Sequence, residues 1–157
     1  GNLCHWTDLT LHLISLEKAF PCVIIPATHQ GAKSDFVVSI MFADQSSASI
    51  TFSAKGQAFE GVKETLIIHK GDLLANLSDF HSFTANLIEK KIKHKLFFRN
   101  HGHQENIVHS IINSLDSNGK GEDINYVRAT AIFFLAIREA IDSGKKVIVS
   151  PDDIIMK

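Results

Sequence analysis

Three side chains near the start of the sequence have the types and spacing for acid–base or metal chemistry: His5, Asp8 and His12. Steps of three and four residues place them on one face of a helix. A histidine and a carboxylate one turn apart can hydrogen-bond to each other or to one ligand. Because histidine titrates near neutral pH, the pair suits proton transfer. Spacing alone is more typical of a surface histidine beside a surface aspartate with no chemical role.

Other reactive residues give weaker patterns. His5, Asp8 and His12 could form a metal-binding module, but structural zinc sites usually gather four convergent ligands, so we expect no metal. The segment His101-Gly102-His103 could also bind metal, although a polar cap at the start of a helix explains it more simply. To act as a nucleophile Cys4 would need an activating base and a lowered pKa, and nothing in the sequence shows either. With Cys22 as the second of two cysteines, we expect a reduced, cytoplasmic protein rather than a disulfide scaffold.

Several elements must position these residues. Apolar residues at three- and four-residue steps predict a helix over residues 3–16, and alternation predicts a hairpin over Ser34 to Ala54. Further strands are expected over 22–29, 64–69, 72–77, 82–88, 94–99 and 147–149. Pro26 favours an edge or bent strand at 22–29. Helices are expected over 104–115 and 123–143, the second with Ile124, Val127, Ala131, Phe134, Leu135 and Ile141 among its apolar positions.

Strands in a block with helices at the ends indicate an α+β fold, an open, mixed, mostly antiparallel sheet with helices packed on one face. The 157 residues fit one domain, and a net charge of −1 without a basic stripe makes nucleic acid an unexpected partner. The basic run Lys90–Lys95 is interpreted as a solvated turn or strand edge. No apolar run has membrane-spanning length, no signal-peptide pattern is present, and no glycine-rich nucleotide-binding motif follows a strand.

Four segments in order resemble the C-terminal domain of the glucose–fructose oxidoreductase and inositol dehydrogenase family. C-H-W-T-D at Cys4–Asp8 resembles that family's H-x-x-D helix, and the run from Phe42 to Phe52 resembles its F-x-D-G-S-x-A-x-I-x-F hairpin. Asp79-Phe80 and then His101–Glu105 resemble its D-F and K-G-H-x-x-E segments. The run from Asn125 to Gly144 resembles its closing helix.

The resemblance implies a substrate-binding and oligomerisation domain, residues 1–157, of an NAD- or NADP-dependent enzyme acting on a sugar, sugar nucleotide or cyclitol hydroxyl. It implies that His5 is catalytic and that Asp8 orients the substrate or the histidine. The dinucleotide-binding domain and the catalytic lysine would lie outside this sequence, so the chain alone would bind no cofactor. It also implies a homo-oligomer formed through the sheet. Members often have an aspartate four residues before the histidine, where this sequence has Gly1.

The chain begins with Gly1 rather than methionine, and its helical pattern is already present at Leu3. We therefore expect it to be part of a longer protein. A non-catalytic sensor or oligomerisation domain of the same fold is the alternative, and a metal-binding module is a further one.

Overall fold

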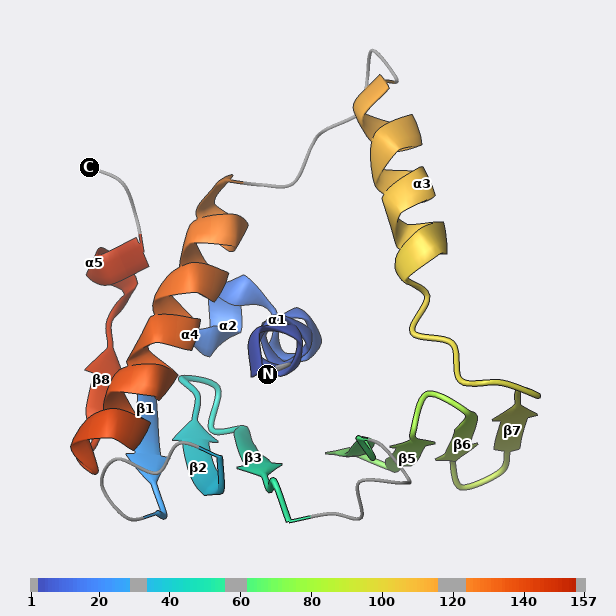
Figure 1. Cartoon of the computed structure of the whole chain (residues 1–157), viewed down its shortest axis with the longest axis horizontal. Helices are drawn as coiled ribbons and strands as arrows, with labels where there is room; N and C mark the ends of the chain where they lie inside the picture. Colours follow the sequence, from blue (N-terminus) through green and yellow to red (C-terminus); the bar gives the residue numbers. More distant parts are fainter. Residues whose placement is uncertain (1–2, 29–33, 56–61, 116–123, 155–157) are drawn as a thin grey trace. The chain divides into compact units, whose positions relative to one another are not determined.

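The computed structural model describes residues 3–28, 34–55, 62–115 and 124–154, and these residues contain eight strands and five helices. The chain divides into two compact units: Gly1–Lys55 with Glu122–Lys157, and Gly56–Gly121. All strand pairs among the described residues are antiparallel and form two four-stranded sheets, where we expected one (Figure 1). The α+β class is confirmed.

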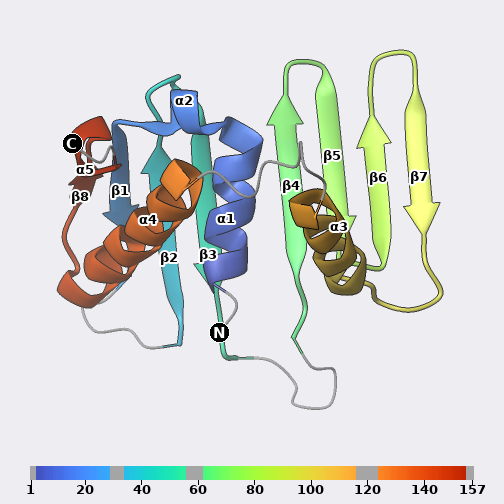
Figure 2. The same ribbon diagram turned by 90° about the horizontal axis from the view of Figure 1, so that it is seen from above.

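The first unit contains a sheet in the order β3-β2-β1-β8. Its strands are β1 (Cys22–Pro26), β2 (Phe36–Met41), β3 (Ser47–Phe52) and β8 (Val147–Val149). Helices α1 (Leu3–Ile14) and α4 (Ile124–Ser143) cover one face of this sheet, as Figure 2 shows. The short helices α2 (Leu16–Ala19) and α5 (Pro151–Ile154) complete the unit, and α5 was not predicted.

The predicted hairpin is confirmed. Strands β2 and β3 pair from Phe36↔Phe52 to Met41↔Ser47, and their connecting turn is closed by a hydrogen bond from Phe42 N–H to the Ser46 carbonyl (3.0 Å). The Asp44 carboxylate accepts the Ser46 N–H (3.0 Å), which is the local bond that makes aspartate common in turns. Alternate residues of β2 are buried, as period-two alternation predicts.

Strand β1 lies inside the sheet, so of the two alternatives expected from Pro26, an edge strand or a bent one, the edge strand is wrong. Pro26 pairs with Val38 of β2, but on the other side β8 stops opposite Ile24. Ala27 N–H donates to the Val37 carbonyl (2.8 Å), so the neighbouring Pro26 nitrogen points toward the side that β8 no longer covers. The missing N–H of Pro26 therefore breaks no ladder bond.

The core of the first unit lies between the sheet and the two long helices. Phe133 of α4 is fully buried, with its ring 6.3 Å from that of Phe20 and 6.1 Å from that of Phe42, measured between centroids. Gly144, with φ +67°, ends α4, as predicted, and donates its N–H to the Ala140 carbonyl.

The apolar positions named from the sequence of α4 are mostly not the residues that it buries. The residues that α4 buries are Ala129, Phe133, Ala136, Ile137, Ala140 and Ile141. Of the apolar positions named from the sequence only Ile141 is buried, whereas Ile124, Val127 and Leu135 are between 49% and 62% exposed. The helix is apolar on two sides, and hydropathy alone does not indicate which side meets the sheet.

The helix predicted over residues 3–16 divides at Ser15, where φ is +73°, into α1 and α2. No helix among the described residues combines the length and the apolar content needed to cross a bilayer.

The second unit contains a four-stranded meander in the order β4-β5-β6-β7 and helix α3 (His103–Leu115). Its strands are β4 (Thr65–Lys70), β5 (Leu73–Ser78), β6 (Ser82–Asn86) and β7 (Lys91–Lys95). The pairing of β4 with β5 across Gly71 agrees with the prediction, and Gly71 has the positive φ of +55° that this tight turn requires.

Strand β7 corrects the prediction for residues 90–99. We expected a basic turn followed by a strand over 94–99. Instead the turn spans Leu87–Lys90, and the basic residues themselves form the strand. Phe97 and Phe98, the apolar residues that suggested a later strand, are 97% and 84% exposed.

Candidate functional site

One face of helix α1 is buried in the core, and the candidate catalytic residues lie on its exposed face. The buried residues are Leu3, Thr7 and Leu11, spaced by one helical turn. The Thr7 hydroxyl donates to the Cys4 carbonyl (2.8 Å), so this buried polar group is satisfied within the helix. His5 and Asp8 are exposed and lie on the opposite side of the helix.

Asp8 is held in place by a residue from the far end of the sequence. The Tyr126 hydroxyl, on α4, donates to Asp8 Oδ1 (2.8 Å) and lies 3.2 Å from the Asp8 carbonyl oxygen. The half-buried Tyr126 is itself fixed because α1 and α4 pack together in the core. The carboxylate therefore keeps one defined orientation, and no donor among the described residues hydrogen-bonds to its second oxygen, which can accept a further hydrogen bond.

This arrangement can bind a hydroxyl-bearing ligand and move a proton. His5 precedes Asp8 by three residues on one exposed helix face, the geometry that the sequence predicted. An imidazole can accept a proton from a hydroxyl, and an oriented carboxylate can accept a hydrogen bond from a neighbouring hydroxyl. Tyr126 was missed because only the packing of α1 against α4, which the sequence does not specify, brings it to Asp8.

Metal and thiol chemistry find little support in the described part of the chain. No three side chains of the His, Cys, Asp or Glu type converge there to hold a metal ion, and His12 is exposed. Burial raises the pKa of the Cys22 thiol to about 12, which keeps it protonated near neutral pH.

The second unit contains a different cluster that joins two segments singled out in the sequence. His101 Nε2 lies 3.1 Å from Glu64 Oε2, and the centroids of the His101 and Phe80 rings are 4.4 Å apart. Arg99 contacts the Asp79 carboxylate and also donates to the carbonyls of Asp79 and Val62. Glu64 and Arg99 carried no signal in the sequence.

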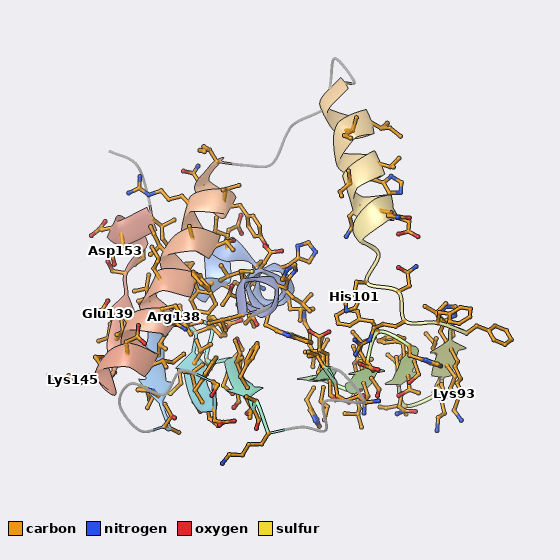
Figure 3. All side chains as sticks on the ribbon, viewed as in Figure 1. Lys93, His101, Arg138, Glu139, Lys145 and Asp153 are labelled. Atoms are coloured by element: carbon orange, nitrogen blue, oxygen red, sulfur yellow. The ribbon has the colours of Figure 1, made fainter. Side chains whose placement is uncertain are left out.

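Through this cluster, Arg99 and His101 of the segment that follows β7 contact Asp79 and Phe80 of the turn between β5 and β6. Asp79 and Phe80 have φ values of +56° and +47°, a strained backbone that surrounding contacts must hold. The Glu64 side chain is 7% exposed, so its carboxylate requires the His101 partner. An open hollow of about 620 Å³ lies beside the cluster, lined by residues 96–101 with Gln104 and Glu105. His101 is labelled in Figure 3. We interpret the cluster as a clamp within the second unit.

The described residues do not fit a dinucleotide cofactor. Such cofactors bind at a glycine-rich turn between a strand and a helix. The connection from β7 to α3 contains one glycine, Gly102, and that from β8 to α5 contains none. Gly119 and Gly121, which we interpreted as part of a loop, lie outside the described residues.

No protein-family model matches the sequence, and no curated protein matches it significantly. Among solved structures, the fold is similar to that of a protein from Thermotoga maritima described as a "putative oxidoreductase", with a TM-score of 0.68. The two sequences are 14% identical, and the similarity covers 93% of this chain but 45% of that one. At this identity the likeness demonstrates a shared fold alone, and the chain spans less than half of that protein's length.

Proposed function

We propose that this chain is the substrate-binding half of an NAD- or NADP-dependent oxidoreductase that acts on a hydroxyl of a sugar, sugar nucleotide or cyclitol. The observation that carries the proposal is an exposed His5 beside an Asp8 oriented by Tyr126, on a fold shared with part of a protein described as an oxidoreductase. The order of the four family-like segments supports the same assignment.

In this proposal the chain contributes binding and proton transfer. Asp8 accepts a hydrogen bond from one substrate hydroxyl and so fixes the sugar ring against α1. His5 takes the proton from the hydroxyl that is oxidised, or returns it in the reverse reaction. The nicotinamide, bound by a part of the protein outside this chain, supplies the hydride chemistry.

The reaction class is tested by following nicotinamide absorbance while the whole protein is supplied in turn with aldoses, sugar nucleotides and inositols. Turnover with at least one of these classes is expected. A whole protein that reduces neither NAD nor NADP with any of them would favour the non-catalytic alternative, a sensor or oligomerisation domain of the same fold.

Tyr126→Phe is expected to raise KM about fivefold with little change in kcat, because it removes the bond that orients Asp8 and leaves His5 intact. Asp8→Asn is expected to raise KM further. In the double variant the two effects on KM should not add, because both act through one contact. Additive effects, or a Tyr126→Phe variant with normal KM, would contradict the role given to Asp8.

We also propose that the chain self-associates through the open face of the β3-β2-β1-β8 sheet. Three large apolar side chains remain on the face that α1 and α4 leave uncovered: Ile25 (38% exposed), Met41 (48%) and Ile148 (57%). Large apolar side chains that gather on an exposed face can mark an association surface.

Met41→Lys should lower the mass measured by light scattering to that of a single chain, because a charge would be buried in the contact. Leu135→Lys, on the exposed side of α4 (62%), is the control and should leave the mass unchanged. A wild-type chain that is monomeric at micromolar concentration would refute this contact.

A further inference from the structure

Strand β7 carries its three lysines in one row. Lys91, Lys93 and Lys95 pair with Asn86, Thr84 and Ser82 of β6, so their side chains share one face of the sheet. All five residues of β7 are exposed, and Figure 3 shows Lys93 on this strand, at the end of the sheet opposite to β4. Successive lysines are about 6.8 Å apart, twice the rise per residue of an antiparallel strand.

The same three residues direct their backbone groups away from the sheet. Leu87 and Lys90 exchange two hydrogen bonds across the turn (2.7 and 3.3 Å), and Leu96 N–H donates to the His81 carbonyl (2.8 Å). Bonded and non-bonded pairs alternate along an antiparallel ladder. The Leu87–Lys90 and His81–Leu96 pairs are bonded, so the alternation between them makes Ile92 and His94 the residues of β7 that hydrogen-bond to β6. The backbone N–H and C=O groups of the three lysines therefore point away from β6. Among the described residues, β7 pairs with β6 alone.

The charge on this face has one sign. No Asp or Glu of β4–β7 lies on the lysine face, and the neighbouring positions of β5 and β6 include the neutral Asn76, Thr84 and Asn86. The three ammonium groups are therefore not neutralised within the sheet.

We propose that β7 is a docking edge for an acidic segment that binds as an added antiparallel strand. A strand bearing Asp or Glu at every second position has the same repeat as the lysine row. This added strand hydrogen-bonds to the outward backbone groups of Lys91, Lys93 and Lys95. Each of its carboxylates then lies directly opposite the ammonium group of one lysine.

Competing occupants fit this edge less well. A second copy of β7 would set lysine against lysine, and such like-charge pairs are destabilising. Single-stranded nucleic acid normally stacks its bases on aromatic side chains. The aromatic residue of β6, Phe83, lies on the face opposite to the lysines, and the exposed Phe97 and Phe98 lie beyond the end of β7 rather than within the lysine row. The lysines therefore select an acidic strand by charge and by spacing.

The proposal is tested by fluorescence anisotropy with a labelled ten-residue peptide that alternates Glu with Val or Thr. Two further probes are a peptide of the same composition with its glutamates contiguous and a ten-nucleotide oligothymidylate. The alternating peptide should bind the intact chain at least fivefold more tightly than either. Equal affinity for the two peptides, tighter binding of the oligonucleotide, or no binding of the alternating peptide would overturn the proposal.

Lys93→Glu should weaken binding of the alternating peptide about tenfold. The new carboxylate would repel the peptide glutamate directly opposite it and the glutamates at the two diagonal cross-strand positions. Lys93→Gln, which only removes the charge, should weaken it less. Lys70→Glu, on the sheet's other face at the far edge, is the matched control and should change affinity less than twofold. Circular dichroism verifies folding of each variant. If Lys70→Glu weakens binding as much as Lys93→Glu, the proposal fails.

Amide hydrogen exchange tests the strand geometry separately. In the free chain the amides of Lys91, Lys93 and Lys95 should exchange fast, and those of Ile92 and His94 slowly. The alternating peptide should slow the three lysine amides at least tenfold. Binding without that protection would mean attraction by charge alone, and the added strand would be disproved.

Discussion

Replacing His5 with alanine in the protein that contains this chain is expected to lower kcat by about 10²–10⁴-fold, the usual contribution of a positioned acid–base group. KM should change little, because Asp8, oriented by Tyr126, still binds the substrate. Since His5 is an exposed residue on a helix, its loss should leave the free energy of unfolding within about 0.5 kcal/mol of wild type. Steady-state kinetics by nicotinamide absorbance and urea unfolding measure the two quantities.

His12→Ala is the matched control. His12 is also exposed and lies on the same side of α1, seven residues further along. It has no role in the proposed proton transfer, so its replacement should leave kcat within about twofold, the scatter expected for a neutral surface change. Equal losses for the two variants, or full activity of His5→Ala, would remove the basis for naming His5 catalytic.

Phe133→Ala is expected to destabilise the first unit by about 3–5 kcal/mol, the range for deleting a buried phenylalanine ring. The ring is fully buried and meets Phe20 and Phe42, so its loss leaves a cavity between α4 and the sheet. Against a typical domain stability of about 5–15 kcal/mol, this loss is large. Urea unfolding followed by circular dichroism measures the change.

Leu135→Ala, two residues further along the same helix, is the control for Phe133→Ala. It shows how much of the change in stability comes from placing alanine in the helix rather than from losing a buried side chain. Its side chain is 62% exposed, so the expected change is within about 0.5 kcal/mol. If both variants lose similar stability, the face of α4 that we describe as buried has been misassigned.

The hairpin was predictable because its signal is local. Strict alternation from Phe36 to Phe52, interrupted by a turn containing Asp44, determines both the strands and the face they bury. The end of α4 was predictable for the same reason, since Gly144 lies just beyond the last helical residue.

The packing of helices was less predictable. Helix α4 has apolar residues on two sides, and burial of Phe133 rather than Leu135 depends on where the sheet lies. Strand β7 was misplaced for a related reason: the apolar Leu96, Phe97 and Phe98 suggested a strand, but pairing with β6 selected the lysine-rich residues before them.

The candidate site was half predictable. His5 and Asp8 were recognisable from spacing and residue type, but the hydroxyl that orients Asp8 comes from Tyr126, 118 residues away. Likewise, Phe80 and His101 lay in recognisable segments, whereas the partner carboxylate of Glu64 became visible only once the chain had folded. Contacts between distant segments leave no local pattern in a single sequence.

The central claim is that this chain is the substrate-binding part of a larger redox enzyme and does not hold the nucleotide itself. Calorimetric titration of NADH and NADPH into residues 1–157 and into the whole protein tests it most directly. We expect micromolar binding of at least one nucleotide by the whole protein and no measurable heat with residues 1–157. Tight binding by residues 1–157, or none by the whole protein, would contradict the account.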